Sequence, residues 1–205
     1  MNKNVERGQA TRAHLVDVAT RLFAAHGYDS TSIEMVLAES GASRGSLYHH
    51  FKGKEALFEA VLESVGARIA AEVGEAIAGI SEPLAAQRAG ALAWIRLACD
   101  PVVRQIILID EPAVLGWERW RAFDEMATLP AIRDVLTYAA EAGHIEASHV
   151  DAFAHIALAA TTEVAMMIAR SDDPAATLRA VESAYTEFLD RLLGYPDAPS
   201  GAATA

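Results

Sequence analysis

Cysteine is almost absent from the chain, which has a single one, Cys99, among 205 residues. One thiol cannot form an internal disulfide, so a disulfide-stabilised secreted fold is excluded and a reducing compartment is expected. We interpret Cys99 as a small buried apolar residue rather than a redox centre. The N-terminal stretch MNKNVERGQA lacks the apolar segment of a signal peptide, which also favours a cytoplasmic protein.

Aromatic residues and strand-forming patterns are scarce as well. Aromatic side chains make up 7% of the chain, whereas apolar residues, many of them alanine, make up 52%. This balance favours helices packed on helices. Only one short run, QIILI at 105–109, has a β-like composition. We therefore predict an all-α fold.

Long apolar runs and catalytic motifs are also missing. The longest apolar stretch, Ile156–Ala169, is interrupted by Glu163 and is shorter than the roughly 20 residues that span a bilayer. The sequence has no nucleophile motif, paired-carboxylate motif, phosphate-binding loop or metal-ligand spacing. The adjacent His49 and His50 would point about 100° apart on a helix, so they do not form a metal pair. We predict no membrane contact, no enzymatic activity, no cofactor and no metal.

Negative charge dominates the chain but is unevenly distributed. The formal net charge is −11, yet residues 1–60 contain seven basic and seven acidic residues, so the later residues carry all of the excess. Within Gly41–Lys54 there are three basic residues and two histidines but no acid. An acid-free basic patch on an acidic protein indicates a negatively charged partner, most commonly nucleic acid.

Start and stop signals divide the first 80 residues into four helices. Thr11 is the predicted N-cap of the first helix, which ends at Gly27. The stretch Thr31–Glu34 has the form of a capping box and begins the second helix, which ends at Gly41. The third and fourth helices are expected over about 44–51 and 54–79.

Prolines near the predicted helix starts punctuate the remainder of the chain. The expected helices are Leu84–Cys99, Val102–Ile109, Ala113–Met126, Ala131–Ala142, Val150–Ala169 and Ala175–Leu193. We predict three regions: a DNA-binding domain at 10–56, a helical ligand-binding and dimerisation domain at 57–194, and a disordered tail at 195–205. No linker separates the two domains, so the fourth helix would connect them directly.

Two short helices joined by a glycine turn form a helix-turn-helix pattern, whose second helix enters the major groove of DNA. With Leu47 and Phe51 facing inward, the outward residues are Arg44, Gly45, Tyr48 and His49. Arg44 can donate two parallel hydrogen bonds to guanine, and Gly45 allows close approach of the helix. The helix starts near Thr31, Ser32 and Lys54 are suited to bind phosphates. Packing roles for Tyr48 and His50 are the alternative.

The stretch TSIEMVLAESGASRGSLYHHFKGKEALFEAVL resembles the DNA-binding signature of the tetracycline-repressor (TetR) family of transcriptional regulators. The resemblance covers Thr11 to about Leu62, and the long fourth helix and helical remainder also fit the family. It implies phosphate contacts at Thr31, Tyr48, His50 and Lys54, and base-facing positions at Arg44, Gly45, Ser46 and His49. One departure is Leu37, where the family usually has a small residue; a bulkier side chain there can change the angle between the short helices.

The later helices give weaker signals. An aromatic-lined cavity for a small apolar or aromatic molecule is one interpretation of five residues, and an ordinary core is the other. The five candidates are Trp94, Trp117, Trp120, Arg121 and Phe123. The family resemblance favours a cavity in this body but does not identify the effector.

The last helix carries an apolar seam with 3-4-3-4 spacing, typical of a coiled coil. Its members are Leu178, Val181, Tyr185, Phe188 and Leu192. Packing within one chain is the alternative, but the family builds its dimer from the last two helices, so we predict a homodimer interface here. The leading hypothesis is a ligand-responsive dimeric transcriptional regulator, most often a repressor, acting on a pseudo-palindromic double-stranded DNA operator. The alternative is a helical carrier or enzyme with an incidental helix-turn-helix.

Overall fold

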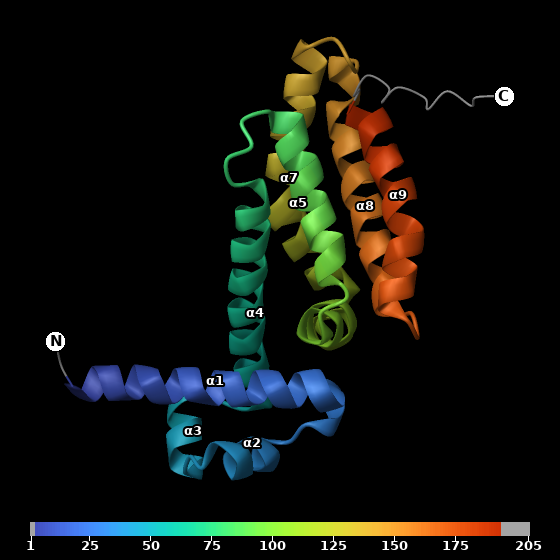
Figure 1. Cartoon of the computed structure of the whole chain (residues 1–205). Helices are drawn as coiled ribbons and strands as arrows, with labels where there is room; N and C mark the ends of the chain where they lie inside the picture. Colours follow the sequence, from blue (N-terminus) through green and yellow to red (C-terminus); the bar gives the residue numbers. More distant parts are fainter. Residues whose placement is uncertain (1–2, 194–205) are drawn as a thin grey trace. The chain divides into compact units, whose positions relative to one another are not determined.

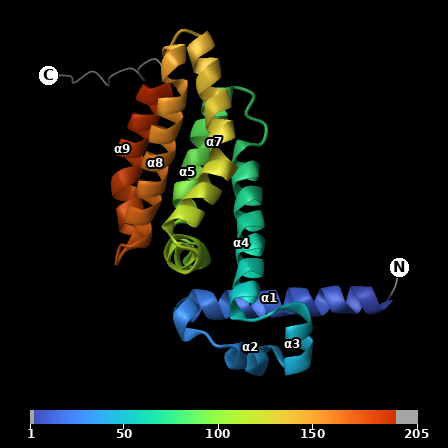
Figure 2. The same cartoon turned by 180° about the vertical axis from the view of Figure 1, so that it is seen from behind.

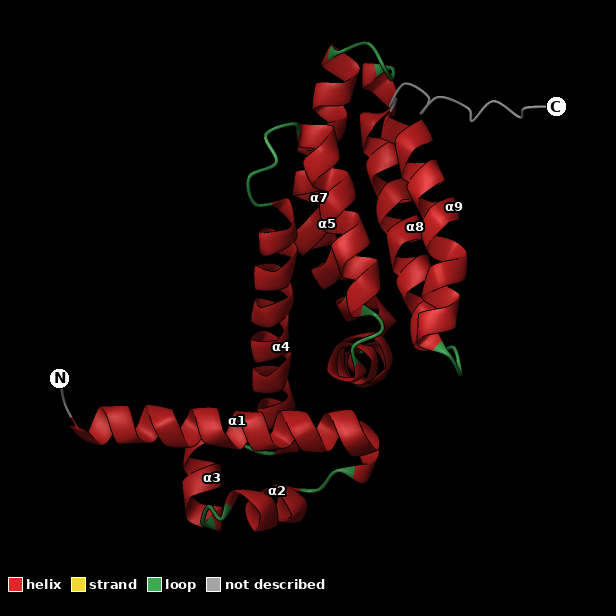
Figure 3. Ribbon diagram, viewed as in Figure 1, coloured by secondary structure: helices red, strands yellow, loops and turns green. Residues whose placement is uncertain are grey.

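The computed structural model describes residues 3–193, and within this range it contains helices and no strand (Figure 3). The predicted all-α class is therefore confirmed. The predicted tail at 195–205 lies outside the described residues. The helices are α1 (Lys3–Ser30), α2 (Ile33–Ser40), α3 (Arg44–His50), α4 (Lys54–Ile77), α5 (Pro83–Leu97), α6 (Glu111–Leu115), α7 (Trp117–Glu141), α8 (Val150–Ala169) and α9 (Pro174–Leu193).

The chain forms two compact units. The first contains the chain up to Ala71 together with Asp100–Trp117, and the second contains Glu72–Cys99 together with the chain from Glu118 onward. The helix α4 contributes residues to both units. Compactness does not test where one functional domain ends, so the predicted boundary at 56/57 stays a prediction.

The first unit is built around α1, which packs against α2 and α3 on one side (Figures 1 and 2). The rings of Phe23, Tyr28 and Phe58 contact one another, with centroids 4.8–5.7 Å apart. Edge-to-face contacts of this kind stabilise a core beyond the burial of apolar area. The predicted cap at Thr11 is wrong, because α1 begins eight residues earlier and the Thr11 hydroxyl donates to the Arg7 carbonyl.

A π-helical segment, Val103–Asp110 (η1), completes the first unit and packs on α1. The sequence predicts an α-helix over Val102–Ile109, so the position is right but the geometry is wrong. A π-helix bonds each carbonyl to the N–H five residues later and is rare outside sites under local constraint. Here aspartates at both ends, Asp100 and Asp110, make contacts with other helices.

The second unit packs α5 against α8 and α9, which run alongside each other (Figures 1 and 2). Pro83 and Pro174 stand at helix starts as expected. The predicted break at Pro130 is wrong, because α7 continues through it. Proline removes one backbone hydrogen bond in a helix interior, and the break at Gly116, with φ of +83°, comes earlier instead.

The helix α8 extends further than its apolar stretch suggests. With the preceding 3-10 turn it spans Ala147–Ala169, and by length and composition alone it could cross a membrane. Core helices of soluble proteins meet the same criteria, and one face of α8 is buried against α5 and α9. The opposite face carries two exposed apolar side chains, Ile156 and Met167.

Candidate nucleic-acid interface

The turn before α3 is built from residues with specific backbone roles. Gly41 adopts a left-handed conformation, φ +68°, and its N–H donates to the Leu37 carbonyl, which ends α2. The Ser43 hydroxyl then accepts from the Ser46 N–H at 3.2 Å and caps α3. Glycine meets the first requirement without steric cost, and serine is among the strongest N-caps. Residues 41–43 therefore form the turn that changes the direction of the chain between α2 and α3.

The inward and outward faces of α3 agree with the helical spacing. Leu47 is fully buried and Phe51, which follows the helix, is buried as well. Arg44, Gly45, Tyr48 and His49 are exposed, and Ser46 and His50 are partly exposed. The structure therefore brings the predicted α3 residues together on one accessible surface, and the alternative of a buried packing role for Tyr48 does not hold.

Gly45 lies in open surroundings on this surface. A Cβ built at Gly45 would have no heavy atom within 4 Å, and the backbone there is ordinary helix. Neither packing nor backbone conformation within the chain therefore requires glycine at this position. A helix that approaches an external surface closely does require it, which is the property expected of a DNA-facing position.

An acid stands beside the recognition helix, although the sequence of α3 contains none. Glu34 of α2 accepts a hydrogen bond from Nη2 of Arg44 at 2.9 Å. The predicted capping box explains why the sequence analysis missed this pair. The N-cap of α2 is Ser32, whose hydroxyl accepts from Met35 N–H, and not Thr31. Glu34 is therefore the second helical residue and not the third, and its carboxylate accepts from the Ser32 hydroxyl instead of the N–H of the cap.

The pKa of the Glu34 carboxyl is lowered from its usual value. Its own backbone N–H is the largest cause, and the hydrogen bond from Arg44 adds to it. Glu34 is therefore ionised at neutral pH, and the exposed face near Arg44 carries charges of both signs.

The predicted phosphate contact at Thr31 needs correction. Its side chain is 1% exposed, and its hydroxyl donates to the carbonyls of Gly27 and Leu22 at the end of α1. A side chain used in this way closes the end of a helix and is not offered to DNA. Ser32, partly exposed at the start of α2, is the accessible hydroxyl in this region.

Lys54 begins α4 and is held by two contacts within the first unit. Its Nζ lies 4.1 Å from the centroid of the Tyr28 ring and donates to the Asp29 carbonyl at 3.4 Å. A lysine over an aromatic face keeps its charge and loses mobility. The ammonium of Lys54 is therefore held next to the C-terminal end of α1.

A buried carboxylate, Asp110, holds the C-terminal end of α1. It accepts hydrogen bonds from the Tyr28 N–H at 2.8 Å and from the Gln105 amide at 3.0 Å. Burial raises the pKa of Asp110, and these hydrogen bonds only partly oppose it. Gly27 lies directly against this pair, since a Cβ there would come within 3.3 Å of the Gln105 Nε2.

Asp100 makes the corresponding contact at the other end of η1. Its two carboxylate oxygens accept from the Arg68 guanidinium of α4 at 2.9 and 3.2 Å. One oxygen also accepts from the N–H groups of Val102 and Val103. Burial alone would raise the pKa of Asp100, but the hydrogen bonds from Arg68 and the two N–H groups lower it. The segment η1 is thus joined to α4 at one end and to α1 at the other.

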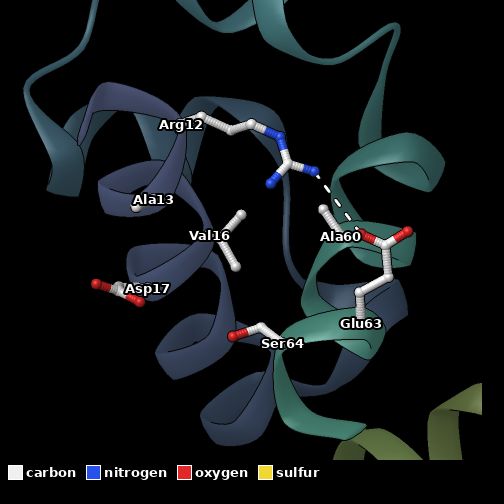
Figure 4. A pocket seen from close by; sticks show the side chains of 7 residues that line it. All are labelled: Arg12, Ala13, Val16, Asp17, Ala60, Glu63 and Ser64. Atoms are coloured by element: carbon white, nitrogen blue, oxygen red, sulfur yellow. Dashed lines mark ion pairs between the residues drawn. The ribbon is translucent and has the colours of Figure 1, made fainter. Parts of the chain in front are cut away.

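Two of the hollows in the described part of the chain are candidates for ligand binding. One, of about 290 Å³, lies between α1 and α4 and is bordered by an ion pair of Arg12 and Glu63 at 3.8 Å (Figure 4). The other, of about 500 Å³, is lined by residues 144–153 and 188–192 of the second unit. Neither includes any of the five predicted ligand-binding residues.

Those five residues have different environments. Trp117 is 61% exposed and belongs to the first unit, whereas Trp120 is 5% exposed and belongs to the second. Trp94 of α5 is half-buried, and the side chain of Phe123 lies outside the described ones. Arg121 pairs with Glu125 at 3.0 Å and with Asp124 at 3.4 Å.

Asp124 links α7 to α8, because its carboxylate accepts from the Thr162 hydroxyl at 3.1 Å. Burial raises the pKa of Asp124 despite this bond and the nearby Arg121. The half-buried pair of Arg121 and Asp124 thus connects a predicted ligand-binding residue to α8.

The apolar seam of α9 is divided between two environments. Tyr185 is buried within its own chain, and its hydroxyl lies 2.6 Å from the Thr161 hydroxyl of α8. Burial raises the pKa of Tyr185 to about 12. At this position the alternative of packing within one chain is correct. The other seam residues, Leu178, Val181, Phe188 and Leu192, are half-buried.

The described residues contain no candidate metal-binding site. No group of three or more histidine, cysteine, aspartate or glutamate side chains between 3 and 193 is arranged to hold an ion.

Two family models match the chain. The model described as "Bacterial regulatory proteins, tetR family" matches residues 15–61, and "Tetracyclin repressor-like, C-terminal domain" matches residues 84–192. Curated relatives match about a third of the chain. The HTH-type transcriptional regulator AcrR of Shigella flexneri is 43% identical over 61 residues, 30% of this chain and 28% of AcrR. The HTH-type transcriptional repressor AcnR of Corynebacterium efficiens is 38% identical over 65 residues, 32% of this chain and 35% of AcnR. The chain thus spans about a third of these relatives' length.

Solved structures match over nearly the whole chain. A TetR-family transcriptional regulator from Pectobacterium atrosepticum superposes with a TM-score of 0.77 at 25% identity, covering 96% of this chain and all of that one. A TetR transcriptional regulator from Chloroflexus aurantiacus gives a TM-score of 0.71 at 25% identity, covering 91% and 97%. The similar proteins are regulators and not enzymes.

Proposed function

Because this chain belongs to the TetR family of bacterial transcriptional regulators, we propose that it binds a pseudo-palindromic DNA operator as a homodimer and is released by a small molecule. Repression is the most common mode of control in the family, and we propose it here. The proposed DNA contacts are the exposed α3 residues together with Ser32 and Lys54, and Thr31 has a structural role.

The observation that carries the proposal is the composition of the α3 surface. Its exposed residues are a guanidinium, a phenol, an imidazole and a glycine without neighbours. Arginine is the commonest reader of guanine, and the other groups can contact bases or phosphates. An accessible surface of this composition at the second helix of a helix-turn-helix fits the major groove.

The experiment is selection of bound sequences from a pool of random duplexes, followed by affinity measurements at several salt concentrations. We expect a pseudo-palindromic site, weak binding to unrelated duplexes because the chain carries a net charge of −11, and a steep loss of affinity with salt. Binding that ignores both sequence and salt would refute the proposal.

Two variants distinguish base contacts from phosphate contacts. Arg44→Ala should cost about 1–3 kcal/mol at the operator and relax preference at one position in each half-site. Lys54→Ala should instead weaken all duplexes alike, because a phosphate contact carries no sequence information. A uniform loss with Arg44→Ala would reassign Arg44 to the backbone.

The proposed dimer uses the exposed side of the last two helices. Ile156 and Met167 of α8 are about half exposed, and Ala159 between them is exposed as well. The exposed Glu163 lies on the same face, so an interface here would be apolar around one carboxylate, and the exposed apolar side chains indicate a packing partner. We propose that this face and the half-buried seam residues of α9 pair with a second copy.

The proposed effector binds in the second unit near Trp120 and the Arg121–Asp124 pair. Since α4 is a continuous helix from Lys54 to Ile77, a ligand-dependent change in its tilt can reach the DNA-binding head. A ligand weakens DNA binding only if it binds the DNA-incompetent arrangement more tightly. Compounds found by thermal shift should therefore lower operator affinity, and a ligand that leaves operator affinity unchanged would argue against this scheme.

A further inference from the structure

The contact between Glu34 and Arg44 joins the first turns of the two helices of the helix-turn-helix. Both side chains are largely exposed, at 64% and 59%, although their charged groups are 2.9 Å apart. Both residues belong to the same compact unit and are held by helices that begin at serine caps. The pair is therefore presented on the surface that we assign to DNA.

The pair contributes little to the stability of the fold. Exposed ion pairs are screened by water and salt and lose side-chain entropy when they form, so many have no measurable effect. A carboxylate at this place also repels DNA phosphates, which weakens binding to any duplex. The carboxylate of Glu34 also accepts a hydrogen bond from its own backbone N–H in the first turn of α2, which favours the helix but does not require Arg44, so the pairing with Arg44 needs a further explanation.

Hydrogen-bond geometry supplies one. The guanidinium of Arg44 has five N–H donors in a rigid plane, and Glu34 accepts from one of them, at Nη2. Guanine accepts two parallel hydrogen bonds through O6 and N7. Arg44 can therefore donate to guanine and to the Glu34 carboxylate at the same time. Holding the long side chain in place beforehand also reduces the entropy lost on binding.

Other base pairs do not allow this arrangement. Adenine presents an acceptor at N7 but a donor at N6, so the guanidinium would have to move away. Glu34 would then lose its cation and face the negative potential of the duplex alone. Its charge therefore makes a wrong base pair less favourable, as repulsive elements do in other specific interfaces.

We propose that Glu34 is a specificity-determining residue, which positions Arg44 for guanine and penalises duplexes that lack guanine at that position. The inference rests on the proposed function of Arg44 as a base contact. It makes a prediction that an ordinary surface ion pair does not make: removing the charge of Glu34 should increase affinity for unrelated DNA while decreasing discrimination at one base pair.

The test uses the full chain and three duplexes: the selected operator, the operator with the guanine pair replaced in both half-sites, and an unrelated duplex of equal length. A good bidentate contact discriminates by about 5- to 150-fold. In Glu34→Gln we expect this ratio to fall by about threefold to tenfold, while affinity for the unrelated duplex rises by about twofold or more. The melting temperature should stay unchanged, since the pair is exposed.

Two further variants separate charge from position. Glu34→Asp keeps the charge but shortens the side chain, so discrimination should fall without a gain in unrelated binding. Glu39→Gln is the matched control. Glu39 lies on the same helix and pairs with Arg21 of α1 at 3.0 Å instead of with a residue of α3. Removing its charge should leave the discrimination ratio unchanged.

The outcomes distinguish this inference from the proposed function. If Glu34→Gln raises affinity for all three duplexes by the same factor, Glu34 acts only as a repulsive charge and the inference is wrong. If discrimination is unchanged in Glu34→Gln but lost in Arg44→Ala, the inference is wrong and the base contact stands. If Arg44→Ala also leaves discrimination intact, the assignment of Arg44 fails first.

Discussion

Asp110→Ala should destabilise the first unit, because this buried carboxylate accepts from donors on two different segments of the chain. Asp110 is 8% exposed, and its partners are the Tyr28 N–H and the Gln105 amide. An orphaned buried donor costs about 1–3 kcal/mol. Both donors are only partly buried and removing a buried charge offsets some of the loss, so we expect about 2–3 kcal/mol in total.

Urea unfolding followed by circular dichroism measures this change. In a chain of this size each kcal/mol lowers the melting temperature by about 2–4 °C, so the expected shift is about 4–12 °C. Asp110→Asn should cost about half as much, since its single acceptor oxygen can serve only one of the two donors.

Asp134→Ala is the matched control, because Asp134 is exposed on α7. An exposed substitution of this kind usually changes stability by less than about 0.5 kcal/mol. If Asp110→Ala falls in that same range, Asp110 does not anchor α1 and the reasoning is refuted. A double variant with Gln105→Ala adds a second check, since the two losses should not be additive for residues that bond each other.

Three further predictions concern other parts of the chain. Gly45→Ala should raise the free energy of unfolding by about 0.5–1 kcal/mol, because alanine favours helix and meets no neighbour. The same substitution should weaken operator binding. Unchanged binding would show that α3 does not approach DNA closely. Asp100 has a lowered folded pKa, so its stabilisation is present above the unfolded value of about 3.9 and is lost as pH falls through the folded value. The stability difference between the wild type and Asp100→Asn should therefore shrink below about pH 4, and a constant difference would contradict the contact with Arg68. Ile156→Glu should convert the dimer to a monomer in light scattering with little loss of helicity, since Ile156 is half exposed in one chain; Val181→Glu tests the α9 seam in the same way.

Helical spacing predicted the recognition helix well. Leu47 and Phe51 are inward as expected, because one turn of helix separates residues that share a face, and this relation depends only on local geometry. The bounds of α8 were also predicted to the residue, from its apolar run. Local signals are sufficient wherever one short segment determines the outcome.

Local signals failed where two segments or two similar residues compete. Thr31 and Ser32 are adjacent hydroxyl residues, and which one caps α2 depends on how the end of α1 uses the other. The bond from Tyr28 to Asp110 connects residues 82 positions apart, and no spacing rule anticipates it. The pair of Glu34 and Arg44 likewise depends on the turn that brings two helix starts together.

The π-helical segment has a consequence for which sequence changes the protein can tolerate. Asp100 and Asp110 each need a partner on a different helix, so the number of residues between them matters as well as the identity of the buried ones. Inserting one residue into Val103–Asp110 while the segment stayed helical would rotate everything after the insertion by about 80–100°. Asp110 would then face away from Tyr28 even if no side chain had been replaced. Substitutions at the exposed Ile109 should therefore be accepted during divergence, whereas truncation of the buried Val103, Ile106 or Leu108 and single-residue insertions should be eliminated.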